Sequence, residues 1–281
     1  MVDIHNCSER LERAKKRLSK LEGSSLLLGF IDHLEAQGLS AGRVAKYGNH
    51  LCTIFKNLKL NPASANRADI ERAVAWINRQ PYKEWTKHDL ELTLRKIVQY
   101  AKCGSCDKKT PLSPEISWVS LNVGKDDSRV KPETLLTPND VKDIVAKAEN
   151  ERDKALLQVF FEGAFRPGEL LTMRVGSVEF GENYCLASVY GKTGIKRVPL
   201  AVSYMPVLEW LQKHPERDNP EAPLWASLSN NAKGEAMSYY YFRKLLKELA
   251  RKAGVKKDVW PYIFRHSCLT SLAKVFTESR L

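Results

Sequence analysis

The sequence has no long hydrophobic run. A helix that crosses a lipid bilayer needs roughly 18 or more consecutive apolar residues, and no segment approaches that length. The first residues, Met1 to Lys20, are charged throughout, which is unlike the apolar stretch of a secretory signal. We therefore expect a soluble, cytoplasmic protein that does not act in a membrane.

Cysteine is too sparse for a disulfide scaffold, with 6 in 281 residues. Cys103 and Cys106 have the spacing of a zinc-binding pair, but no second such pair and no histidine pair follows them. We interpret both as ordinary loop thiols. The cysteines therefore predict no metal site.

Acidic residues are outnumbered, with 33 Asp and Glu against 45 Lys and Arg, which gives a net charge of +12. A cation placed against a nucleic-acid phosphate releases a condensed counterion, so this surplus favours a polyanionic partner. The composition is otherwise that of a packed protein, with 43% hydrophobic and 28% charged residues. The chain is long enough for two domains, each with its own core.

The first part of the chain shows helical periodicity and no convincing strand. Two of its segments are joined by Gly38-Leu39-Ser40, where glycine ends one helix and serine caps the next. The segments with helical spacing are 10–21, 24–38, 40–55, 68–78 and 87–100. We interpret the first of these as a basic, solvated leader helix. Residues 1–122 are therefore predicted to form an all-helical domain.

A polar segment without periodicity, residues 123–134, is predicted to link this domain to a second one over 135–281. The second domain opens at Thr137-Pro138-Asn139-Asp140. Threonine can cap a helix, proline suits its first position, and aspartate in the first turn favours the helix dipole.

Farther along the second domain the period changes to two residues, which indicates strands. The predicted strands are 177–180, 184–190 and 195–200. Gly191-Lys192-Thr193-Gly194 is the turn of a hairpin, so Lys192 stands at its tip. A lysine there also fits an ordinary solvated turn. Helices are expected again over 202–213, 239–253 and 261–273.

Two arginines lie beside helices that begin at a proline. Arg166 follows an apolar helical run and precedes Pro167, and Arg265 lies in the first turn after Pro261. A guanidinium fixed at such a junction can bind two phosphate oxygens at once. Glu169 can reach back to orient Arg166. An Arg-Glu ion pair with a purely structural role fits the same stretch.

The order of these motifs resembles that of tyrosine recombinases of the phage integrase family. The matching segments are Arg166-Pro-Gly-Glu169-Leu-Leu, Tyr190-Gly-Lys192-Thr-Gly-Ile-Lys-Arg-Val-Pro-Leu200 and Pro261-Tyr262-Ile-Phe-Arg265-His266-Ser267. The first helical hairpin also resembles the core-binding domain of that family. The resemblance implies a mainly α protein, a two-domain DNA clamp with an all-helical core-binding domain and a mixed α/β catalytic domain with a three-stranded sheet.

The resemblance further implies site-specific recombination of double-stranded DNA through a 3′-phosphotyrosine, by a homotetramer on paired sites and without metal or ATP. Arg166 and Arg265 would stabilise charge on the scissile phosphate. Lys192 would be the general acid for the leaving 5′-oxygen, and Glu169 would hold Arg166.

Other basic residues are expected to contact DNA. These are Arg43, Lys46, Arg243, Lys244, Lys247 and His266. The basic face of the helix over 239–253 is equally consistent with a face turned to water. The favoured interpretation of His266 is a polar residue packed against the strand layer.

The sequence departs from the family pattern at two points. Tyr262 stands where the family usually has histidine, and a phenol with a pKa near 10 is a poor base that chiefly donates a hydrogen bond to phosphate. No tyrosine follows Tyr262, whereas the family nucleophile lies beyond the second arginine. We therefore interpret the chain as truncated, and expect it to bind DNA and position a phosphate without cleaving.

Two alternatives stay open at this point. One is a DNA-binding protein that keeps the recombinase clamp without its catalysis. The other is an enzyme like the type IB topoisomerases, which relaxes DNA by the same chemistry without pairing sites.

Overall fold

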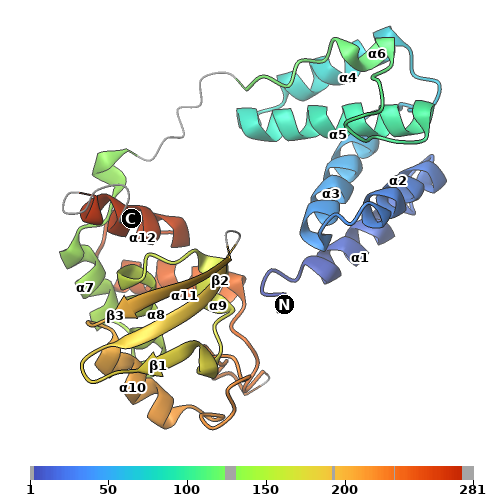
Figure 1. Ribbon diagram of the computed structural model, residues 1–281. Helices are drawn as coiled ribbons and strands as arrows, with labels where there is room; N and C mark the ends of the chain where they lie inside the picture. The colour runs from blue at the N-terminus through green and yellow to red at the C-terminus, as the bar shows by residue number, and fades with distance from the viewer. Residues whose placement is uncertain (1–2, 124–130, 192–193, 231, 274–281) are drawn as a thin grey trace. The chain divides into compact units, whose positions relative to one another are not determined.

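The computed structural model describes residues 3–123, 131–191, 194–230 and 232–273 (Figure 1). The chain divides into two compact units. The helical unit is Asn6–Arg129, and the mixed unit contains the residues up to His5 together with those from Val130 onward. Among the helices of the described residues, none is both long and apolar enough to cross a membrane.

The helical unit has six helices in its described part and no strand there. They are α1 (Cys7–Leu18), α2 (Ser24–Ala36), α3 (Ala41–Asn57), α4 (Arg67–Arg79), α5 (Glu84–Cys103) and α6 (Pro114–Ser117). Helix α3 packs against α1, α2 and α5, and its Leu51 and Ile54 are fully buried with Phe30 of α2. Helix α6 was not predicted, because four residues are too few to show a period.

The mixed unit contains the remaining elements. They are α7 (Pro138–Ala146), α8 (Glu151–Glu162), α9 (Pro167–Leu171), β1 (Val178–Phe180), β2 (Cys185–Gly191), β3 (Gly194–Leu200), α10 (Tyr204–Lys213), α11 (Tyr239–Lys252) and α12 (Pro261–Leu272). Short 3-10 turns lie at Pro132–Thr134 and Val175–Ser177. The predicted cap of α7 is present, because the Thr137 side chain accepts a hydrogen bond from the Asp140 N–H.

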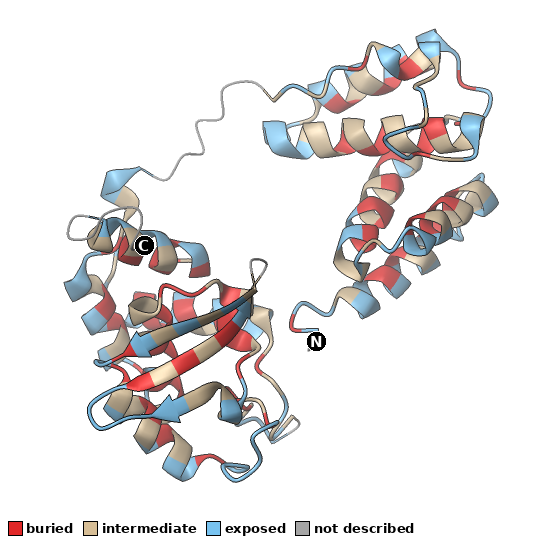
Figure 2. Ribbon diagram, in the orientation of Figure 1, coloured by how far each residue is buried: buried red, intermediate tan, exposed pale blue. Residues whose placement is uncertain are grey.

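The three strands form one antiparallel sheet in the order β1-β2-β3. Its central strand β2 is the most buried of the three, with Cys185, Ala187 and Val189 facing the core (Figure 2). On β3 the alternation leaves Ile195 exposed at 70%. The predicted fold class, mostly helical with a small three-stranded sheet, is confirmed.

The first described residues pack with the mixed unit, although the sequence placed them in the first domain. Ile4 is 6% exposed within the core of the mixed unit, and its carbonyl accepts a hydrogen bond from the Tyr239 N–H at 3.0 Å. The His5 ring lies 4.8 Å from that of Tyr239. The predicted linker over 123–134 ends in the Pro132–Thr134 turn, while its residues 124–130 lie outside the described part.

Candidate active site

The turn between α8 and α9 fixes the position of Arg166. A Cβ at Gly163 would overlap the ring of Phe165, so only glycine fits there. Ala164 has a φ of 44°, in the left-handed region that residues other than glycine seldom adopt. Pro167 then begins α9, which leaves Arg166 as its N-terminal flanking residue with a side chain that is 40% exposed. The turn thus presents the guanidinium to solvent on a rigid backbone.

Glu169 holds Arg166 at two points. The Arg166 N–H donates to Glu169 Oε2 at 2.9 Å, and Arg166 Nη1 donates to Oε1 at 2.8 Å. Lys196 Nζ of β3 lies 3.3 Å from the same Oε1. Burial of Glu169, which is 5% exposed, would by itself raise its pKa. The hydrogen bonds from Arg166 and Lys196 outweigh that effect and lower the pKa of Glu169 below its ordinary value.

Arg265 of α12 is brought to the same turn. Its Nη1 donates to the carbonyl oxygen of Ala164, the residue with the left-handed backbone. Burial, followed by the positive charge of Arg166, lowers the pKa of Arg265 from its ordinary value. Two guanidiniums therefore lie close enough to repel each other. A phosphate bound by both would offset that repulsion.

The β2–β3 hairpin is tied to the same carboxylate. Gly191 lies so close to Glu169 that a Cβ at this position would overlap Oε1. Gly191 and Gly194 are register partners at the end of the hairpin. Lys192 lies outside the described residues, so its role as general acid stays a prediction.

Tyr262 and His266 are both exposed on α12. Tyr262 is 45% exposed. Burial, and then the charge of Tyr262, raise the pKa of the Tyr239 phenol above its ordinary value. His266 is exposed as well. The interpretation that His266 packs against the strand layer is therefore wrong, since α12 turns this side chain to solvent.

The other predicted DNA contacts are exposed, but not all carry a free charge. Arg43 and Lys46 belong to α3 of the helical unit, and Lys46 Nζ lies 2.6 Å from Asp89 Oδ2. Arg243, Lys244 and Lys247 lie on the exposed face of α11 in the mixed unit. Lys247 Nζ is 3.8 Å from Asp258 Oδ1, an exposed pair that contributes little.

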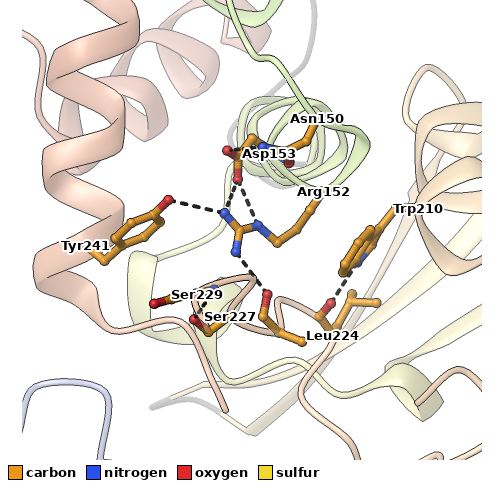
Figure 3. Close-up of polar contacts among 9 residues, drawn as sticks. Asn150, Arg152, Asp153, Trp210, Leu224, Ser227, Ser229 and Tyr241 are labelled. Carbon is orange, nitrogen blue, oxygen red and sulfur yellow. Dashed lines mark hydrogen bonds and ion pairs between the residues drawn. The ribbon is translucent and has the colours of Figure 1, made fainter. Parts of the chain in front are cut away.

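Arg152 of α8 forms a buried ion pair with its neighbour Asp153 and also contacts Tyr241 in the first turn of α11 (Figure 3). Arg152 is 2% exposed, and its Nη2 lies 2.7 Å from Asp153 Oδ1. Its Nη1 donates to the Ala226 carbonyl at 3.0 Å, and its guanidinium lies 5.6 Å from the centre of the Tyr241 ring. The helix that carries the predicted basic face is therefore contacted in its first turn by a buried arginine, Arg152.

Arg152 and Lys196 were not predicted as functional residues. Arg152 sits in the first turn of a helix, where a solvated side chain is the usual expectation, and nothing local indicates its partners. The sequence around Lys196 does contain an indication of its role. Alternation along β3 places it on the same face as Val198 and Leu200, which turn toward the core, and a lysine there needs a partner.

The sequence model of the phage integrase family matches residues 134–277. A tyrosine recombinase of Synechococcus elongatus is 30% identical over 146 residues, which cover 49% of this chain and 45%, about half, of that relative. Tyrosine recombinase XerA of Pyrococcus horikoshii is 24% identical over 272 residues, covering 95% of this chain and 86% of XerA. The solved structure of a lambda integrase tetramer bound to a Holliday junction has a TM-score of 0.68 at 14% identity. That match covers 91% of this chain and 74% of the other, and indicates a shared fold.

Proposed function

This chain belongs to the phage integrase family, and we propose on that premise that it is a site-specific DNA recombinase acting through a 3′-phosphotyrosine. The observation that carries the proposal is the pair of neighbouring guanidiniums, Arg166 and Arg265, anchored on Glu169 and on the Ala164 carbonyl. Such a rigid pair of cations suits a phosphodiester, whose non-bridging oxygens gain negative charge in the transition state.

In the proposed reaction a tyrosine hydroxyl loses its proton to water, and its oxygen bonds to phosphorus while the bond from phosphorus to the 5′-oxygen breaks. Lys192 gives its proton to the departing 5′-oxygen, and the reverse attack by a 5′-hydroxyl rejoins the strand. Arg166 and Arg265 hold the phosphate, Glu169 orients Arg166, and Tyr262 donates a hydrogen bond to a phosphate oxygen. The energy of the phosphodiester is kept in the covalent intermediate, so the reaction requires no ATP.

We propose that the nucleophilic tyrosine is not one of these 281 residues, since no tyrosine follows Tyr262. The 281-residue chain would then bind duplex DNA and hold a phosphate without cleaving it. We further propose that recombination takes place in the cytoplasm on paired sites in a homotetramer. The tetrameric lambda integrase, with its related fold, supports that assembly.

A second candidate is a DNA-binding protein that uses the clamp without cleaving in any context. The same observation favours it, together with the phenol of Tyr262 in place of an imidazole.

The test begins with duplexes selected for binding from a random library. We expect affinity to fall steeply as salt rises. In ethylation interference, ethylation of one phosphate should strongly reduce binding of the wild-type protein. Arg166→Ala should lose that interference while retaining most of the affinity. Arg217→Ala is the control, because Arg217 is 61% exposed and its one ion pair within the described residues is with the exposed Asp218.

A nicked version of the selected duplex then tests cleavage. The 281-residue chain is expected to form no covalent adduct, and an adduct would overturn the non-cleaving assignment. Failure to bind any duplex would overturn the proposed function as a whole. If an adduct does form, relaxation of plasmids without the selected site would favour the topoisomerase-like alternative.

A further inference from the structure

Helix α1 carries five basic residues and only two acidic ones, Glu9 and Glu12. Its buried residues, Leu11, Ala14 and Leu18, pack it into the helical unit, where it lies against α3. The family match covers only 134–277, so it assigns nothing to α1. By its sequence alone this basic helix fits a solvated leader.

An open groove of about 640 Å³ runs along one side of α1. Its lining residues are Arg10, Arg13, Lys16, Arg17, Lys20 and Asn49. All of them except Asn49 of α3 are cationic, and all five cations are exposed. We call these five residues the α1 basic stripe.

The charges of the α1 basic stripe are scarcely neutralised. Within the described residues its one ion pair joins Arg13 to Glu9 at 3.6 Å, and both side chains are 63% exposed. Arg17 Nη2 donates to the neutral Asn49 amide oxygen, and its Nε donates to the Arg13 carbonyl at 3.3 Å. These contacts orient guanidiniums without removing their charge.

Lys15, on the same helix, shows the opposite arrangement. Its Nζ lies 2.7 Å from Glu35, 3.9 Å from Asp32 and 4.0 Å from Glu12. The hydrogen bond to Glu35 is the main cause of its raised pKa. Three acids thus lie beside Lys15, whereas within the described residues Glu9 alone pairs with the α1 basic stripe. The other cations of the stripe form a row of like charges, which repel unless an anion lies among them.

The geometry suits a polyanion with regularly spaced charges. From Arg10 to Arg17 the helix rises about 10 Å, which is the length of about three base pairs at roughly 3.4 Å each along one strand of duplex DNA. Arginine forks bind phosphate oxygens in pairs, and Asn49 adds an amide donor. We propose that the α1 basic stripe binds the sugar-phosphate backbone of duplex DNA. This inference rests on the proposed function and adds a contact surface to it.

The test compares the salt dependence of DNA binding for the wild type and for Arg10→Gln/Arg13→Gln/Arg17→Gln/Lys20→Gln. Each lost phosphate contact lowers the slope of log K against log salt by about 0.9, so the slope should fall by about 2 to 4. Lys15→Gln removes one charge from the same helix and is the matched control, with an expected slope change near zero. The triple variant Arg10→Lys/Arg13→Lys/Arg17→Lys keeps the charge and should retain the slope.

Three results separate the inference from the proposed function. No binding by the wild type would refute the proposed function. Binding with an unchanged slope in the fourfold variant would refute the stripe inference alone. An unchanged slope together with an altered sedimentation coefficient would assign the stripe to a contact with a protein partner. That result would also overturn the stripe inference. If the fourfold variant fails to fold, Arg10→Gln/Lys20→Gln gives the same test with a slope change of about 1 to 2.

Discussion

At the scale of single residues, Glu169 accepts hydrogen bonds from Arg166 and Lys196, which come from different elements. Its pKa is lowered from an ordinary value of 4.5. The unfolded chain therefore takes up the proton first as pH falls. The stabilisation by the ionised carboxylate is full above pH 4.5 and is lost as pH falls through the pKa of the folded state.

We expect Glu169→Gln to lower the free energy of unfolding of the mixed unit by about 2 kcal/mol at pH 7, the usual size for hydrogen bonds to a charged group. The difference from wild type should shrink below pH 4.5. Urea denaturation at pH 7 and at low pH measures both.

Glu179→Gln is the control for that prediction. Glu179 Oε2 lies 2.6 Å from Arg197 Nη2, but the two side chains are 61% and 54% exposed. Loss of an exposed pair should cost less than about 1 kcal/mol. An effect of Glu169→Gln that is the same at both pH values would contradict the role assigned to its charge.

At the scale of elements, the α8–α9 turn depends on Gly163. Gly163→Ala should destabilise the mixed unit by about 1–3 kcal/mol, because the new Cβ meets the Phe165 ring in a packed site. It should also weaken the interference caused by ethylation of that phosphate, since the turn carries both Arg166 and the carbonyl that binds Arg265. Thermal unfolding and ethylation interference give the two readouts.

Gly168→Ala, in α9 itself, is the matched comparison. A Cβ at Gly168 meets nothing within 4 Å, and alanine is the better helix former by roughly 0.5–1 kcal/mol. We expect this variant to be neutral or slightly more stable. Equal losses in both variants would mean that glycine is required for a reason other than the Phe165 contact.

At the scale of the whole molecule, the two units have separate hydrophobic cores. Leu51 is fully buried in the helical unit, so Leu51→Ala should cost about 2–5 kcal/mol there. Calorimetry of the full chain should show one transition shifted to lower temperature and a second left in place. A single transition that shifts as a whole would show that the units unfold together.

Much of the fold was predictable because its signals are local. Thr137 and Asp140 cap their own helix, and the alternation from Cys185 to Leu200 marks two strands and their turn. The periodic apolar positions of the helical unit likewise predicted α2 to α5. The predicted ends moved by a few residues, because terminal turns depend on neighbours as well as on the local sequence.

The sequence by itself determined the elements, the basic surplus and the order of Arg166, Lys192 and Arg265, since each depends on residues near one another in the chain. Only the tertiary structure decided which charges meet. Lys196 of β3 reaches Glu169 of α9, Arg152 is buried against Tyr241, and Ile4 enters the core of the mixed unit. It also distinguished Lys15 from the α1 basic stripe, because two of the acids beside Lys15, Asp32 and Glu35, come from α2. Charge compensation depends on distances through space, which no spacing along the chain encodes.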